Sequence, residues 1–150
     1  MSTQTIQGTT FSFQLIGHWE QVSEKFATLA AAIPEDKFDF KPTGGTRTVA
    51  DVLRHVAFWN RFVADNARGN KADDTTNEVS KEKFAARSQI LSELRRSAKD
   101  ATEALRNSKS GMALETSEML TTFIEHTSEH YGQLAVYARL NGIVPPASRA

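Results

Sequence analysis

The sequence predicts an all-α protein built as a four-helix bundle, in a single domain that covers residues 1–150. Four stretches repeat apolar residues every three or four positions, which is the pattern of an amphipathic helix with one buried face. Loops rich in polar residues, glycine or proline separate these stretches, and no stretch of useful length alternates as a half-buried strand does. Helices with apolar stripes, joined by loops of moderate length, bury those stripes against one another.

The first helix is expected to begin at Phe11 and to end at Ile33, because Pro34 lacks the N–H that a further helical turn needs. Residues 1–10 are polar and are expected to be loose. His18 lies beside the apolar stripe, where a surface histidine is the simpler interpretation. The stripe itself consists of Leu15, Trp19, Val22, Phe26, Leu29 and Ile33.

The second helix is predicted from a capping box, in which Thr48 is the N-cap and Asp51 is the third helical residue. The helix is expected to fade near Gly69. His55 lies next to the apolar arc, one turn before Trp59. The arc contains Val49, Val52, Leu53, Val56, Trp59, Phe62 and Val63.

The third helix is predicted to follow Ser80 as its N-cap, with Val79 and Phe84 as a hydrophobic staple. Its apolar stripe runs from Phe84 to Leu105. Acidic and basic residues are interleaved on the other faces, which is typical of a solvated helix and not of a nucleic-acid surface.

The fourth helix is expected to follow a loop at Asn107–Thr116 that contains Gly111. It opens near Thr116 or Ser117, and its core arc is Leu120, Phe123, Thr127, His130, Leu134 and Ala138. Gly142 supplies a left-handed cap, and the proline pair that follows prevents continuation of the helix.

The composition excludes several classes of protein. Lys+Arg and Asp+Glu are both 18, so the formal net charge is zero and no overall field attracts nucleic acid or an anionic membrane. The absence of cysteine excludes disulfides, a thiolate metal site and a cysteine nucleophile. No signal peptide or membrane-spanning run is apparent, so a cytoplasmic protein is expected.

The strongest chemical signal is a pair of histidines, His126 and His130, in the fourth predicted helix. Residues four apart lie on one helix face, with Cβ atoms about 6 Å apart, so both rings can approach one ion. His55 lies at a similar margin of the second helix. Three histidines from two helices are the pattern of a metal site. From spacing alone, boundary histidines satisfied by hydrogen bonds remain the alternative.

Three rival metal motifs are incomplete. His126 to His130 matches H-x-x-E-H, but the further carboxylate ligand of that class is missing, since no Asp or Glu follows His130. H-E-x-x-H needs a glutamate where Thr127 stands. The Glu-x-x-His of di-iron bundles fails because Phe123, Thr127 and Val52 occupy the glutamate positions.

Several segments together resemble the DinB-like family of small bacterial metal-binding bundles: Ile33-Pro-Glu-Asp-Lys-Phe-Asp-Phe-Lys-Pro42, Thr48-Val-Ala-Asp-Val-Leu-Arg-His55, His126-Thr-Ser-Glu-His130-Tyr-Gly-Gln-Leu134 and Tyr137-Ala-Arg-Leu-Asn-Gly142-Ile-Val-Pro-Pro146. The resemblance covers nearly the whole chain. It implies an up-up-down-down four-helix bundle, often a homodimer, with a divalent ion on His55, His126 and His130. Several relatives transfer low-molecular-weight thiols to electrophiles.

These observations predict a divalent-metal-dependent enzyme, a small-thiol S-transferase or a hydrolase that acts on small electrophiles. Three imidazoles leave a coordination position open, and imidazole ligation suits zinc or nickel, with iron as a further choice. Any thiol has to come from outside, because the chain has none. The alternative is a metal-binding stress-response protein without turnover.

Candidate pocket residues are His18, Trp59 and Tyr137, although His18 is not expected to ligate the ion and the aromatic side chains could simply be core. Candidate residues around the ligands are Asp51, Glu129, Tyr131 and Gln133, for which capping or solvation is the simpler interpretation. The expected partner is a small-molecule substrate, with no nucleic acid and no membrane.

Overall fold

The structure, a computed structural model, describes residues 3–108 and 114–150, with side chains from Ser12 onward. It contains four long helices, α1 (Thr3–Ala32), α2 (Val49–Ala67), α3 (Arg87–Arg106) and α4 (Leu114–Leu140). Two short 3-10 turns, η1 (Glu35–Lys37) and η2 (Pro146–Ser148), complete the secondary structure, and no strand occurs in the described ranges. The predicted all-α four-helix bundle is therefore confirmed.

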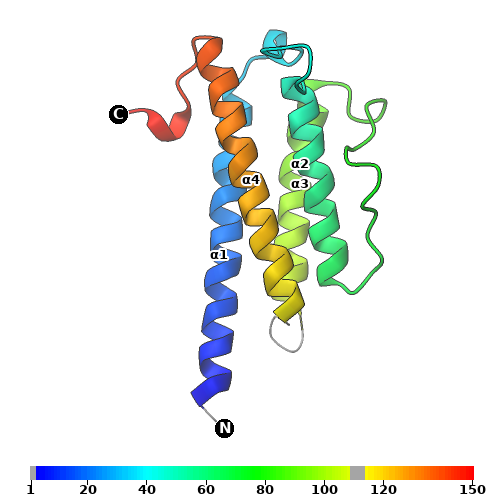
Figure 1. Cartoon of the computed structure of the whole chain (residues 1–150), viewed down its shortest axis with the longest axis vertical. Coiled ribbons are helices and arrows are strands. Elements are labelled where there is room, and N and C mark those ends of the chain that lie inside the picture. The colour runs from blue at the N-terminus through cyan, green and yellow to red at the C-terminus, as the bar shows by residue number, and fades with distance from the viewer. Residues whose placement is uncertain (1–2, 109–113) are drawn as a thin grey trace.

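Each long helix packs against two others: α1 and α2 each contact both α3 and α4 (Figure 1). Arg106 bonds to Glu20 and Arg87 bonds to the Ile33 carbonyl, so α1 and α3 are antiparallel. Pairs from α2 to α3, such as Asn60 with Ser97 and Arg68 with Asp100, show that these two helices are parallel.

Trp59 of α2 stacks on Phe123 of α4, and His55 lies beside His130, so α2 and α4 are antiparallel. The helices therefore run up, down, down, up, and the up-up-down-down order implied by the family resemblance is wrong. The reason lies in the connections. The segment between α1 and α2 stays at one end of the bundle, so α2 returns antiparallel to α1 (Figure 1). The segment 68–86, here named the crossover, runs back along α2 and restarts α3 at the same end as α2 (Figure 1).

Two predicted helix starts are corrected. The first helix begins at Thr3 and not at Phe11, since residues 3–10 hold no proline and each added residue gains a backbone bond. The third begins at Arg87 and not after Ser80, whose side chain caps a separate turn by accepting from Lys83 N at 3.3 Å. Arg54 of α2 donates to the Phe84 carbonyl at 2.9 Å and so occupies an acceptor that a continuing helix would use.

Other predicted boundaries agree with the structure. Thr48 caps α2 and accepts from Asp51 N at 3.1 Å. Gly142 follows α4 with φ +73°, in the left-handed region that glycine adopts without strain. The last helix starts at Leu114, slightly before the predicted position, and Gly111 of the preceding loop lies outside the described residues.

The apolar core has two parts. One gathers Phe26, Leu53 and Leu134 with their neighbours, and the other gathers Trp19, Val63 and Leu120. On α4, the two histidines lie between Leu120 of one part and Leu134 of the other, so the metal candidates interrupt the core. Within the described residues, no helix combines the length and apolar character needed to cross a membrane.

Candidate metal centre

His55 of α2 and His126 and His130 of α4 meet between these two antiparallel helices. The Nε2 atoms of His55 and His126 are 2.9 Å apart. The ring centroids of the three pairs are separated by 4.5–4.9 Å. Each residue offers one nitrogen, and the three nitrogens lie within 4.8 Å of one another. The three histidines are therefore positioned to bind a metal ion.

His55 is oriented by the crossover. Its Nδ1 lies 2.7 Å from the backbone oxygen of Asn77. A carbonyl oxygen only accepts, so Nδ1 carries the proton and donates it. Nε2 then holds a lone pair directed at the other histidines, which is the tautomer that a metal ligand requires. Asn77 also accepts from Trp59 Nε1 through its Oδ1 at 3.0 Å.

His130 is oriented by a hydrogen-bonded chain that ends on the backbone before α2. The Tyr137 hydroxyl donates to the Arg47 carbonyl at 2.9 Å, so it accepts from Gln133 Nε2 at 3.0 Å. The Gln133 oxygen then faces His130 Nδ1 at 2.8 Å, and Nδ1 must donate. The Nε2 atom of His130 is consequently unprotonated, as that of His55 is.

His126 differs from the other two ligand candidates. Its Nδ1 is buried and has no hydrogen-bond partner among the described residues. Its Nε2 faces the unprotonated Nε2 of His55 at 2.9 Å. Two nitrogen lone pairs repel at this distance, so the contact requires either a proton on His126 Nε2 or a cation between the rings.

Burial keeps the three imidazoles neutral. Desolvation lowers the pKa of His55 to about 4, where the bond to Asn77 opposes the shift and the charges of Arg47 and His130 add to it. Desolvation, with the neighbouring histidines and Arg47, lowers the pKa of His126 to about 3. The pKa of His130 is lowered by burial as well, although Gln133 opposes that shift. Neutral imidazoles are the form that binds metals, so no proton has to leave at neutral pH.

The chain that carries these three histidines matches a known protein family over almost all of its length. The model of the DinB family matches residues 1–149. The chain belongs to the DinB family. A search among curated proteins finds no match.

An aromatic wall borders the centre of this DinB-family chain on one side. Trp59 stacks on Phe123 with ring centroids 5.2 Å apart and an interplanar angle of 22°. Its ring also meets His55 and His126 edge-on, at 6.4 and 6.2 Å. Trp59 is half-buried, so the wall reaches the surface.

Of the other residues predicted from the sequence, some connect to the three histidines and others do not. Tyr137 is buried and connects to His130 through Gln133. His18 is exposed on α1 and is not part of the three-histidine group. Asp51 pairs with Arg54 and Lys81. Glu129 is exposed, and its charge opposes the lowering of the pKa of His130. Tyr131 lies under the Lys25 ammonium, 4.4 Å from it.

A cavity of about 600 Å³ adjoins the hydrogen-bonded chain that orients His130. Its lining consists of Gly44, Gly45, Thr46, Arg47, Asp51, Glu78 and Gln133. A larger hollow of about 1050 Å³ lies among α1, α3 and the C-terminal part of the chain, and none of the three histidines lines either space. Only the smaller cavity connects to the three-histidine group through a hydrogen bond among the described residues, that between its lining residue Gln133 and His130.

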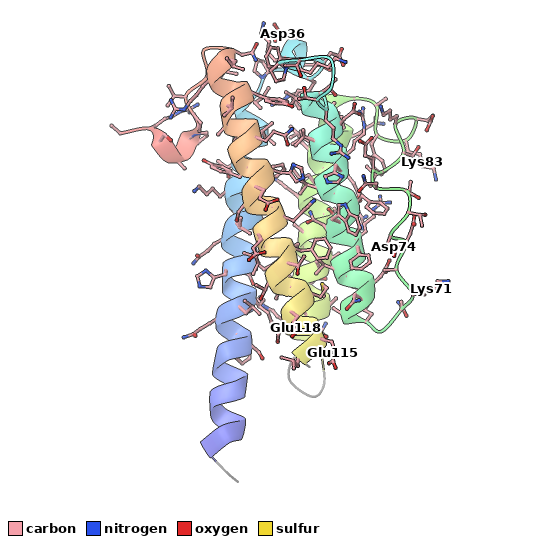
Figure 2. The ribbon with its side chains drawn as sticks, viewed as in Figure 1. Asp36, Lys71, Asp74, Lys83, Glu115 and Glu118 are labelled. Atoms are coloured by element: carbon pink, nitrogen blue, oxygen red, sulfur yellow. The ribbon has the colours of Figure 1, made fainter. Side chains whose placement is uncertain are left out.

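The sequence did not point to Asn77 or Arg47. Asn77 has φ +67°, a left-handed conformation that asparagine tolerates better than most residues, and it lies 22 residues from His55. Figure 2 shows Lys71, Asp74 and Lys83 on the same crossover, and all three are exposed. From the sequence, the segment around Asn77 therefore has only the pattern of a polar loop, and nothing in it indicates a residue that orients His55.

Proposed function

We propose that this protein is a divalent-metal-dependent enzyme that holds its ion on His55, His126 and His130. The proposed reaction transfers a small thiol to a small electrophile, or hydrolyses such an electrophile. The observation that carries the proposal is the donor set: three neutral nitrogens and, in the group formed by the described residues, no fourth protein ligand. Three protein ligands with a position left over are typical of catalytic zinc sites, whereas structural sites are closed.

The residues present fit a metal ion. Two ligand atoms at about 2.0–2.1 Å from one ion lie no more than about 4.2 Å apart. Tetrahedral ligation places ligand atoms about 3.4 Å apart, and the three nitrogens already lie within 4.8 Å, so side-chain rotations that move a nitrogen by about 1–1.5 Å would bring them into range. A cation between His55 and His126 would also remove the repulsion of two lone pairs at 2.9 Å. Zinc and nickel both suit an all-imidazole set, and iron(II) is a further candidate.

A divalent ion at this place would lower the pKa of a thiol or a water molecule that reaches it. In the proposed transfer, the thiol gives up its proton to solvent, and its sulfur forms a bond with the electrophilic carbon. The leaving group departs with its bonding electron pair and takes up a proton. In hydrolysis, water takes the place of the thiol in the same balance.

The chain's own residues prepare the site for this chemistry. Asn77 and Gln133 keep the Nδ1 protons of His55 and His130 directed away from the centre. Trp59 and Phe123 form an apolar surface that can contact the substrate and exclude water from one side. Gln133 belongs to the series of hydrogen bonds that orients His130, and it also lines the 600 Å³ cavity. This double position supports entry of the substrate from that cavity.

The competing function is metal binding without turnover. The test is a screen of zinc-loaded and nickel-loaded protein with small thiols and monobromobimane, a thiol-reactive electrophile, alongside ester hydrolysis. The proposal expects a rate above the uncatalysed one that disappears in His55→Ala. A fully loaded protein with no rate enhancement for any thiol or ester would favour the binding function. A small-molecule substrate and a homodimer complete the proposal, and light scattering after gel filtration tests the dimer.

A further inference from the structure

Arg47 brings a positive charge to the edge of the three-histidine centre. Its backbone carbonyl accepts from Tyr137, which begins the chain that orients His130. Its side chain is about one-third exposed, at 34%, and lines the 600 Å³ cavity together with Gln133. Its charge contributes to the lowered pKa of all three histidines, which agrees with a guanidinium close to the centre.

The two Nη groups of Arg47 are free to bind a ligand, as far as the described residues show. Its Nε donates to Glu78 Oε1 at 3.0 Å. Among the described residues, its side chain makes no other hydrogen bond, so both terminal Nη groups are available. Two parallel N–H groups at the Nη edge match the two oxygens of a carboxylate, and such paired bonds are among the stronger hydrogen bonds in proteins.

The charges around the cavity favour an anionic guest at Arg47. The cavity lining holds two carboxylates, and both are already paired. Asp51 bonds to Arg54 at 2.9 Å and to Lys81 at 3.1 Å, while Glu78 is the partner of Arg47. Gly44 and Gly45 present only backbone to the cavity, so no bulky side chain at these positions restricts a guest. A divalent ion nearby would add further positive charge.

We propose that the molecule that reacts at the centre carries a carboxylate, and that the two Nη groups of Arg47 bind it. This inference rests on the proposed metal-dependent function and names the class of its substrate. The carboxylate belongs either to the thiol or to the electrophile, and both sources share the same chemistry. Arg47 is then a specificity-determining residue, and its ion pair with Glu78 is not merely a surface contact.

The experiment compares two thiols by calorimetric titration of zinc-loaded protein. 3-Mercaptopropionate carries a carboxylate and 2-mercaptoethanol does not. Arg47→Gln should weaken binding of 3-mercaptopropionate about tenfold or more, as expected for loss of charge-assisted hydrogen bonds, and should change binding of 2-mercaptoethanol by less than about twofold. Arg47→Lys should be intermediate, because it keeps the charge but not the fork. Glu78→Gln should tighten binding by removing the competing carboxylate.

A second titration separates the two sources of the carboxylate. Succinate is added to protein saturated with 2-mercaptoethanol, so a carboxylate is offered without a thiol. If the affinity for 3-mercaptopropionate falls in Arg47→Gln, the carboxylate belongs to the thiol. If the affinity for succinate falls instead, the carboxylate belongs to the electrophile. The matched control is Arg95→Gln, which removes an arginine from another exposed ion pair, that with Glu24 on the α1–α3 side, and should leave both titrations unchanged.

Metal content is measured first, so that the two proposals can fail separately. Protein that takes up no zinc would overturn the proposed function and the carboxylate inference with it. Protein that holds zinc, but binds 3-mercaptopropionate and succinate equally well with and without Arg47, would overturn the carboxylate inference alone. Unchanged circular dichroism and metal content in Arg47→Gln would show that a weakened titration reports binding and not unfolding.

Discussion

Replacing Asn77 by alanine should disturb both the stability of the bundle and its metal site. The side chain of Asn77 accepts the Trp59 Nε1–H at 3.0 Å, and a lost hydrogen bond of this kind costs about 1 kcal/mol. Alanine at φ +67° adds a left-handed backbone penalty of about 1–2 kcal/mol. Asn77→Ala should therefore lower the free energy of unfolding of the metal-free protein by about 2–3 kcal/mol.

The same substitution should weaken metal binding, because a backbone that leaves the left-handed conformation carries the carbonyl of residue 77 away from the Nδ1 proton of His55. Loss of a group that orients a ligand histidine typically reduces metal affinity by about 10- to 100-fold. Urea unfolding measures the stability, and competition with a chelator of known affinity measures the metal binding. Asn77→Asp is the matched control, since it keeps an oxygen acceptor and tolerates the left-handed region, and it should stay within about 1 kcal/mol of the parent.

The result for Asn77→Ala would refute this reasoning if both properties remained those of the parent protein. Unchanged stability would mean that the crossover does not hold Trp59 in solution. Unchanged metal affinity would mean that the carbonyl of residue 77 keeps its place beside His55 without asparagine in the left-handed conformation.

Three further predictions concern the histidines. Because burial lowers the pKa of His55 to about 4 and that of His126 to about 3, metal-free protein has its full stability above about pH 6.5 and should lose up to about 3 kcal/mol per pH unit as the pH falls from about 6 to 4. Urea unfolding at several pH values checks this, and the loss should be much smaller in His55→Gln/His126→Gln. Chelation of metal-loaded protein should lower the thermal midpoint by about 5–10 °C and leave the circular dichroism helical, whereas complete unfolding would mean that the ion holds the fold together. His18→Ala should keep its metal, and a content as low as that of His55→Ala would point to a closed four-histidine site.

The helices could be predicted from sequence because their evidence is local. Apolar spacing, Pro34 and the left-handed Gly142 set most of the boundaries without any contact between distant residues. The start of α3 could not be read in this way, since it depends on a side chain of α2, Arg54, that bonds to the Phe84 carbonyl 30 residues away. The relative directions of the helices depend on the path of the crossover, which the resemblance did not describe correctly.

The candidate metal centre likewise has parts that local sequence evidence predicts and parts that depend on contacts between distant residues. The spacing of His126 and His130 predicts a shared helix face, and His55 could be added because the chain has only four histidines to choose from. The groups that orient them could not be identified in advance. The chain that orients His130 ends on Arg47 O, 90 residues from Tyr137, and the partner of His55 is a backbone oxygen that has no side-chain signature.

The central claim is that three histidines from two helices hold one ion. Its most direct test is the metal content, by mass spectrometry, of protein purified without added metal. The account predicts about one divalent ion per chain in the parent protein, and the loss of most of it in His55→Ala and His130→Ala alike. Full metal content in both variants, or none in the parent protein even after incubation with zinc or nickel, would contradict it.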